Sequence, residues 1–207
     1  MKIKYPKTYH LPWSEGISSD DKIQHDLSHF ENKDIIISEK MDGENTTLYS
    51  NYIHARSLDS KDHLSRHWIK GLWGNIKHEI PDNWRICGEN LYAKHSIYYN
   101  NLPSYFLVFS IWNKNNICLS WKETKEWCNL LNLNTVPILY EGKFNLNFVK
   151  NFKIDISKQE GFVMRLSNEF KFEDFNKSVT KWVRESHVKT NKHWMRDKII
   201  PNKLKNK

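Results

Sequence analysis

The sequence has little of what marks secreted, membrane-spanning or disulfide-rich proteins. It holds only three cysteines, Cys87, Cys118 and Cys128, which are widely spaced and form no Cys-x-x-Cys pair. An odd number at such spacing argues against a disulfide framework and indicates small buried thiols in a reducing, cytoplasmic compartment. No apolar run approaches the roughly 18 residues of a membrane span. No apolar stretch follows the first lysines, so we expect neither a membrane segment nor a secretory signal.

The sequence does contain enough apolar and basic residues for a folded protein that meets a polyanion. Hydrophobic residues make up 39% and aromatic residues 14% of the 207 positions, which excludes extensive disorder and suits one domain. The net charge is +8 and the pI is about 9.2, a balance typical of proteins that bind nucleic acid. Charge alone does not distinguish RNA from DNA, or either from an acidic membrane.

Strand patterns outnumber helix patterns along the chain. Segments rich in β-branched and aromatic residues predict strands at 35–41, 46–50, 52–57, 84–91, 104–112, 161–166 and 178–184. Helical spacing covers residues 60–78, which end before Pro81, and a short helix is expected at 145–152. Another helix begins at a capping box, in which Ser120 is followed by Glu123. We expect it to reach about Leu131, with four apolar side chains facing inward: Trp121, Trp127, Leu130 and Leu131.

Strands interrupted by helices without regular alternation predict an α+β fold with largely antiparallel sheets flanked by helices. Residues 1–187 are expected to form this domain, and the first 33 residues, which are mixed and polar, to be a short entry region. Residues 188–207 are expected to be a short basic tail whose last residues are mobile. About 20 residues are too few to build an OB-fold domain.

The most informative segment is Glu39-Lys40-Met41-Asp42-Gly43, which directly follows an apolar run. A lysine at the end of a buried strand is well placed to be a nucleophile. Since a free lysine titrates at about 10.4, it needs burial or a nearby cation to lose its proton. The glycine permits a tight turn and the close approach of a ligand. The same residues also suit an ordinary Asp-Gly turn after a strand, so the motif needs support from the rest of the chain.

Further segments carry side chains that suit a nucleotide. Glu89 ends a strand and can bond a ribose hydroxyl, and the Phe109 ring can stack on a purine. Glu160 stands at the start of a strand and offers a hard oxygen ligand to Mg²⁺. Taken singly, Glu89 would be a surface carboxylate and Phe109 a core ring. Cations for phosphates come from three positions: Arg56, Lys181 and Arg184.

In their order along the chain, these segments resemble motifs I, III, IIIa, IV and V of the covalent nucleotidyltransferase superfamily. The matching stretches are 39–45, 88–91, 106–109, 160–163 and 181–182. The sequence is most similar to the RNA ligase 2-like group of ATP-dependent RNA ligases, because Asn45 follows the motif glycine by two positions.

The resemblance implies a nucleotidyltransferase fold in which Lys40 attacks ATP and carries AMP. It implies that the backbone around Glu39 reads the adenine edge and that Phe109 stacks on the base. Glu89 would bind the ribose and Lys181 would contact the α-phosphate.

The resemblance also implies a divalent metal and an RNA substrate. Glu160 would engage Mg²⁺ or Mn²⁺, whereas Asn45 and Arg56 would hold the phosphate end of the RNA. The AMP would pass to an RNA 5′-phosphate, and a 3′-hydroxyl would then seal the strand. We expect a monomer that acts in the cytoplasm of a cell or of an infected host.

Two departures from the family pattern affect individual residues. The last motif usually carries two lysines separated by one residue, but here Val183 takes the second place and Arg184 follows, as a candidate substitute. Ser110 stands where a relative has an aspartate. Outside the motifs, His63 and His67 have a spacing that can bind zinc, but no third ligand is evident and a polar helix face explains them better. His95 is a candidate for lining the RNA path.

Two other functions remain open at this stage. One is a minimal ATP-dependent DNA ligase or a GTP-using capping guanylyltransferase, although both normally bring a following OB-fold domain. The other is a nucleic-acid-binding module that kept the fold and lost catalysis. The presence of Lys40, Glu89, Glu160 and Lys181 together favours an enzyme.

Overall fold

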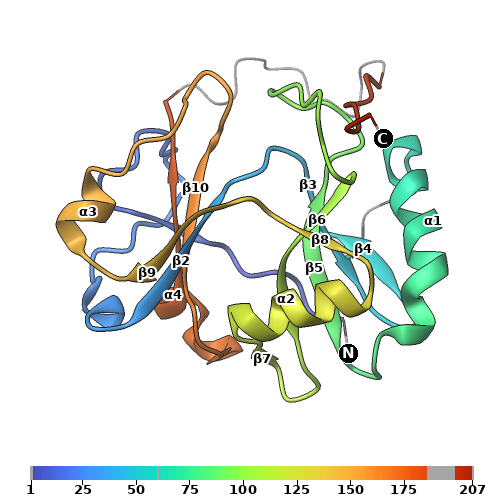
Figure 1. The fold of residues 1–207 in the computed structure, drawn as a ribbon, viewed down its shortest axis with the longest axis horizontal. Coiled ribbons are helices and arrows are strands. Elements are labelled where there is room, and N and C mark those ends of the chain that lie inside the picture. The colour runs from blue at the N-terminus through green and yellow to red at the C-terminus, as the bar shows by residue number, and fades with distance from the viewer. Residues whose placement is uncertain (1, 60, 186–198, 207) are drawn as a thin grey trace.

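The computed structural model describes residues 2–59, 61–185 and 199–206. Two twisted sheets lie side by side and form the body of the molecule (Figure 1). All strand pairs of the two sheets are antiparallel except two, β1 with β12 and β6 with β8, among the residues described. The α+β fold with largely antiparallel sheets is therefore confirmed.

The first sheet has five strands in the order β1-β12-β10-β2-β9. Their bounds are β1 Tyr9–His10, β12 Val179–Val183, β10 Gly161–Leu166, β2 Asp34–Glu39 and β9 Ile138–Lys143. The run Ile35-Ile36-Ile37 is fully buried, as expected for a strand covered on both faces. The edge strands β1 and β9 were not predicted, and β1 brings the N-terminal segment into the sheet.

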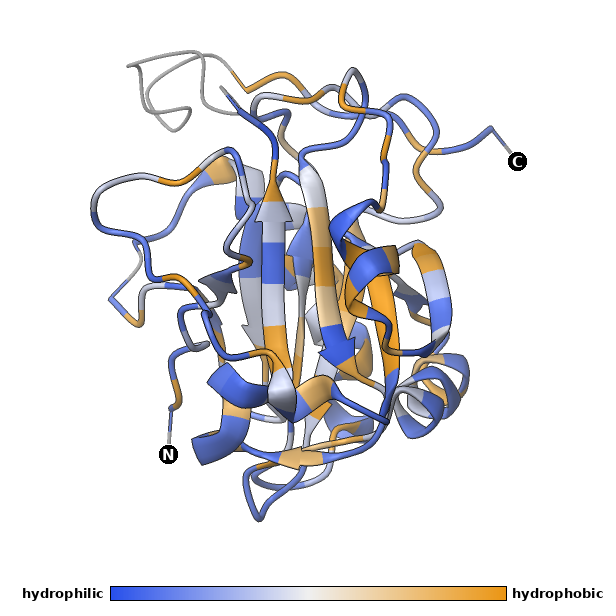
Figure 2. Ribbon diagram, turned by 90° about the vertical axis from the view of Figure 1, so that its left-hand side faces the viewer, coloured by the Kyte–Doolittle hydropathy of each residue, from blue (hydrophilic) through white to orange (hydrophobic). Residues whose placement is uncertain are grey.

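The second sheet follows the order β11-β7-β6-β5-β3-β4, with β8 also beside β6. Its strands are β11 Phe170–Lys171, β7 Ile117–Cys118, β6 Phe106–Trp112, β5 Arg85–Asn90, β3 Glu44–Leu48, β4 Ile53–Ala55 and β8 Asn134–Thr135. In Figure 2 hydrophobic residues gather on the strands, and most surrounding loops are hydrophilic. The three cysteines are buried in this packing, and burial raises the pKa of each thiol, consistent with their role as small core residues.

Helices cover the outer faces of the sheets. Helix α1 (His67–Ile76) lies against the second sheet and is flanked by the short 3₁₀ turns Leu64–Arg66 and Lys77–Glu79. It begins later than the predicted 60–78 segment. The side chain of His63 caps the first turn by accepting a hydrogen bond from the Ser65 amide. Helices α3 (Leu146–Lys150) and α4 (Phe175–Ser178) lie near the first sheet.

Helix α2 (Trp121–Leu130) begins at the predicted capping box. Ser120 accepts from the Glu123 amide, and the Glu123 side chain accepts from the Ser120 amide. The prediction that Leu130 faces inward was wrong, because Leu130 is 77% exposed at the last helical position. Cys128 fills the inward position of that turn instead.

Residues 199–206 pack against the connection between β5 and β6, residues 91–105, instead of being mobile as expected. Asn202 is 1% exposed there. In Figure 1 this red segment lies beside the green connection, above the strands. No helix in the described part of the chain is long and apolar enough to cross a membrane.

Candidate active site

A cavity of about 630 Å³ opens between the two sheets, and side chains from both sheets line it. Most of the predicted site residues meet there, although they come from segments spread over more than a hundred positions of the chain. Those that line the cavity are Glu39, Lys40, Asn45, Arg56, Glu89, Phe109 and Lys181. Glu160 reaches the same place through its contact with Lys40.

Lys40 directly follows the buried strand β2. Its amide donates to the carbonyl of Gly161 at 3.0 Å, and its Nζ donates to Glu160 Oε2 at 2.6 Å. The Lys40 side chain is 26% exposed and that of Glu160 only 6%. Gly161 is required beside this pair, because a Cβ at that position would lie 2.1 Å from the carbonyl oxygen of Trp182. The close approach of β10 to β12 thus sets the position of Glu160 under the lysine.

Burial and neighbouring charges shift the pKa values of Lys40 and Glu89. Burial alone would lower the pKa of Lys40, but the carboxylates of Glu160 and Glu89 outweigh it, so the net shift of its pKa is upward. Burial, together with the charge of Glu160, raises the pKa of Glu89 to about 8. Near neutral pH Lys40 is therefore charged and Glu89 is largely protonated, which limits the cost of burying the cluster. In this state Lys40 is protonated and is not yet a nucleophile.

A tight turn joins Lys40 to β3. Asp42 Oδ2 accepts three hydrogen bonds, from the Ser96 amide at 2.8 Å, the Ser96 hydroxyl at 2.6 Å and the Ile97 amide at 2.7 Å. The amide of Gly43 donates to Glu89 Oε1 at 3.1 Å. A Cβ on Gly43 would lie 2.5 Å from the carbonyl oxygen of Asn90. The Asp-Gly pair therefore forms the turn, and the turn also orients Glu89.

One end of the cavity carries the cation Lys181. Burial, and then repulsion from Lys40, lower the pKa of Lys181 to about 8. Asp21 lines the cavity nearby, and its pKa is lowered to about 2 because hydrogen bonds from Ser18 and attraction to Lys181 outweigh its burial.

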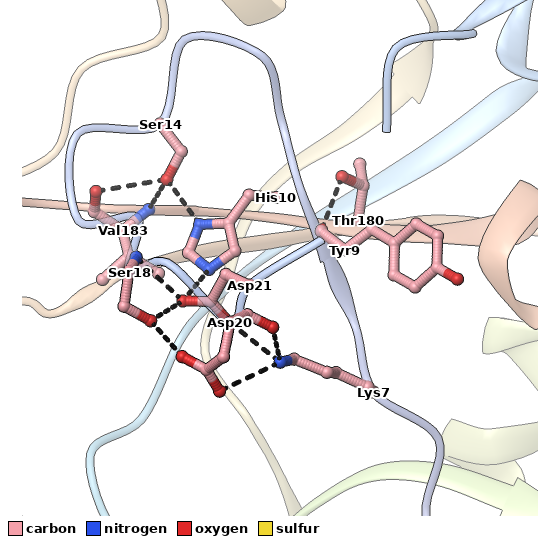
Figure 3. A network of polar contacts seen from close by, with 9 residues as sticks. All are labelled: Lys7, Tyr9, His10, Ser14, Ser18, Asp20, Asp21, Thr180 and Val183. Carbon is pink, nitrogen blue, oxygen red and sulfur yellow. Dashed lines mark hydrogen bonds and ion pairs between the residues drawn. The ribbon is translucent and has the colours of Figure 1, made fainter. Parts of the chain in front are cut away.

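The N-terminal segment holds this end of the cavity together through a polar network (Figure 3). His10 lies opposite Lys181 in the parallel pair of β1 and β12. Its ring contacts Ser14 Oγ at 2.9 Å and Asp21 Oδ2 at 3.4 Å. Ser14 in turn accepts from the Val183 amide at 2.9 Å. The network ties the end of β12 to the loop that carries Asp21.

Two aromatic rings line the cavity. The rings of Tyr5 and Phe109 meet edge to face, with centroids 5.1 Å apart, and both line the cavity. Ser110 lines it as well and accepts from the Trp112 indole at 3.0 Å. The Glu39 amide donates to the Pro137 carbonyl at 2.9 Å. The Glu39 N–H is therefore already hydrogen-bonded within the protein. Any hydrogen bond to a base edge at this position would have to come from other polar groups.

Further polar groups line the cavity. Arg56, which is exposed, and His95 are among them. Asn45 Oδ1 is buried and has no hydrogen-bond partner within the described ranges, which leaves that end of the amide available to a ligand. Glu44 and Arg66 form a bidentate pair at 2.7 and 2.5 Å on the same wall.

Arg184 is not among the lining residues. It follows the last residue of β12, and side chains alternate along a strand, so Arg184 does not share the face of Lys181. Its amide donates to the Glu160 carbonyl at 3.0 Å. The histidines of the zinc-like spacing lie elsewhere, with His67 3.5 Å from Asp62. No group of three or more metal-ligating side chains occurs in the described residues.

Several lining residues were not predicted from the sequence. Tyr5, Lys7, Thr8 and Asp21 come from the first 33 residues, which carry no motif. The strand in this segment, β1, has two residues and is too short to give a periodic pattern in the sequence.

Comparisons with known proteins show the family and the fold of the chain. The family model described as RNA ligase matches residues 33–183, which is more than half of the chain. The chain belongs to the RNA ligase family. A comparison with curated proteins gave no match.

Solved structures share the fold of this RNA ligase family member. A mutant Naegleria gruberi RNA ligase with ATP and Mn superposes with a TM-score of 0.53 at 15% identity, covering 90% of this chain and 62% of that one. An archaeal ATP-dependent RNA ligase superposes with a TM-score of 0.57 at 16% identity, and the match covers 89% of this chain and 49% of that one. A putative ATP-dependent DNA ligase from Aquifex aeolicus superposes with a TM-score of 0.55 at 20% identity, and the match covers 89% of this chain and 50% of that one. The chain thus spans less than two thirds of the length of these neighbours.

Proposed function

We propose that the protein is an ATP-dependent RNA ligase that joins RNA 3′-hydroxyl and 5′-phosphate ends through a lysyl-AMP intermediate. The observation that carries the proposal is Lys40, held beside Glu160 and Glu89 at the end of a buried strand in a cavity large enough for a nucleotide. Family membership and a net charge of +8 support RNA as the polymer.

In the first step the neutral Lys40 amine attacks the α-phosphorus of ATP. The bond between the α-phosphorus and the bridging oxygen breaks, pyrophosphate leaves, and the amine loses its proton. In the second step an RNA 5′-phosphate oxygen attacks the same phosphorus, the P–N bond breaks, and Lys40 recovers a proton. In the third step the RNA 3′-hydroxyl oxygen attacks the phosphorus of the 5′-phosphate and gives its proton to solvent. The bond from that phosphorus to the AMP oxygen breaks, so AMP leaves as the new phosphodiester bond forms.

The cavity side chains divide between the nucleotide and the RNA. Phe109 stacks on adenine with its ring held by Tyr5, and Glu89 bonds the ribose. Lys181 neutralises the α-phosphate. Asn45 and Arg56 bind the RNA end, with Arg184 as a further candidate. Affinity for RNA should fall steeply with salt, since the contacts are to phosphates.

The carboxylate of Glu160 fits a divalent ion. Mg²⁺ is commonly held by one or two carboxylates plus substrate phosphates, so few protein ligands are needed. When bound, Mg²⁺ or Mn²⁺ supplies charge neutralisation on the phosphates and competes with Lys40 for the Glu160 carboxylate.

The test is a covalent adduct followed by sealing. Protein mixed with ATP and magnesium should gain one AMP on the peptide that carries Lys40, as read by mass spectrometry, and GTP should give no adduct. Nicked RNA duplexes should then be sealed faster than nicked DNA of the same sequence. Absence of the adduct would refute the proposal, and preference for nicked DNA would move the protein to the DNA ligases.

The pKa of Lys181 predicts that the gain in adenylylation with rising pH stops near pH 8. More Lys40 is neutral as the pH rises, so kcat/KM for ATP, which reports the free enzyme, should increase at first. Because the pKa of Lys181 is about 8 in the free protein, Lys181 loses its charge above that pH and binds phosphate less well, so the increase should level off. In Lys181→Arg the guanidinium stays charged, and the increase should continue above pH 8 even if the overall rate is lower. The same levelling in the variant would show that another group causes it.

A further inference from the structure

The C-terminal segment (residues 199–206) lies outside the stretch matched by the RNA ligase family, which ends at residue 183. It packs on the β5–β6 connection (residues 91–105), the same connection that binds Asp42. Main-chain hydrogen bonds of 2.8 to 3.0 Å join the two, and they link Lys94 with Ile200, Asn202 with Tyr92, Lys203 with Tyr99, and Leu102 with both Lys203 and Lys205.

Asn202 is the centre of this contact. Its side-chain amide donates to the Leu91 carbonyl at 2.8 Å, and its Oδ1 accepts from the Tyr99 amide at 2.9 Å. Its main-chain carbonyl accepts from the Tyr105 hydroxyl at 3.0 Å. The side chain is buried with both polar ends bonded, so it fits one arrangement of the connection.

The apolar residues of the segment contribute less. Ile200 is 52% exposed and Leu204 is 38% exposed. The segment is therefore held largely by hydrogen bonds, which depend on direction, rather than by hydrophobic contact, which does not. Such a contact fixes the position of the connection more than it enlarges the core.

The β5–β6 connection also holds Asp42, which lies close to Lys40 in the chain. Tyr99, whose amide bonds Asn202, accepts from the Asp42 amide through its hydroxyl at 2.9 Å. Three residues earlier, Ser96 holds the Asp42 carboxylate. Asp42 lies two residues after Lys40, and Leu91 lies two residues after Glu89. The C-terminal segment is thus linked to Asp42 through Tyr99, and to the end of β5 that carries Glu89 through Leu91.

The geometry points to Asn202 as a positioning residue for the adenylylation of Lys40, acting through the β5–β6 connection and Asp42. This inference rests on the proposed function, because its readout is the lysyl-AMP adduct. A displacement of about 1 Å at a reacting atom can cost on the order of a hundredfold in rate, so Asn202 matters even though it touches no substrate.

The test compares Asn202→Ala with Asn100→Ala, a control in the same connection at an exposed position. The rate of adduct formation at saturating ATP should fall by about tenfold or more in Asn202→Ala, while KM for ATP changes less. Hydrogen exchange at the amides of Ser96 and Ile97 should speed up. The control should match the wild type in each measurement.

A saturating rate in folded Asn202→Ala within about twofold of the wild type would overturn the inference, since a purely structural residue lowers only the melting temperature. Should Asn202→Ala fail to fold, Tyr105→Phe decides, because it removes only the hydroxyl bond to Asn202. A lower saturating rate in that variant supports the inference, and an unchanged rate overturns it. If the wild type itself forms no adduct, the proposed function fails and Asn202 is not at issue.

Discussion

Lys40→Ala should lose adduct formation with ATP completely, and with it the sealing of RNA that carries an ordinary 5′-phosphate. No other amine can replace it at the same place, because Lys181 stands on β12 and serves as a phosphate-binding cation in the proposed mechanism. Removal of a nucleophile from comparable enzymes costs more than about a thousandfold. Mass spectrometry after incubation with ATP and magnesium measures the effect directly.

The variant also separates the first step from the later ones. RNA carrying a 5′-adenylyl group already contains the activated bond, so Lys40→Ala should still seal it at a measurable rate and should bind RNA like the wild type. The control is Lys158→Ala, which removes an exposed lysine that does not line the cavity and should keep adduct formation within about twofold. Adduct formation by Lys40→Ala would remove this residue from the mechanism.

The strand motifs could be predicted because they combine a local pattern with a fixed chemical role. The buried run before Lys40 and the capping box at Ser120 each follow from short-range rules. Residue patterns placed the seven predicted strands, β2 to β6, β10 and β12, to within a few residues of their observed ends, whereas β1, β7, β8, β9 and β11 were not predicted. The motif residues then met in one cavity because antiparallel neighbours bring the ends of β2 and β10 together.

The rest of the site depends on contacts between distant residues. Tyr5 and Asp21 reach the cavity because β1 adds to the edge of the first sheet in parallel to β12, a pairing across about 170 positions. Asn202 stands in a sequence of lysines, asparagines and a proline that predicted a mobile tail, and only its partners at 91 and 99 explain its burial. Local pattern carries no information about such partners.

Glu160→Gln should slow adenylylation by about a hundredfold or more at neutral pH, although it removes the charge that keeps Lys40 protonated. Glu160 has two roles of opposite sign. Its carboxylate lies 2.6 Å from Lys40 Nζ and raises the pKa of Lys40, which opposes attack. The same carboxylate is the proposed ligand of the divalent ion that neutralises the phosphates, and loss of such stabilisation costs a factor of about 10²–10³. We expect the second role to dominate.

The two roles predict different pH and metal profiles, so the variant can decide between them. If the metal role dominates, Glu160→Gln needs more magnesium than the wild type, and raising the pH does not restore its rate. A wild-type sample with a chelator should then stay inactive at high pH as well, because a neutral lysine still meets an unshielded triphosphate.

Glu141→Gln, the same change at an exposed position on β9, is the control and should leave the rate within about twofold of the wild type. If Glu160 served only to hold the proton on Lys40, its variant would form the adduct faster than the wild type below pH 7 with an unchanged need for magnesium, because a lower pKa leaves more of the amine neutral.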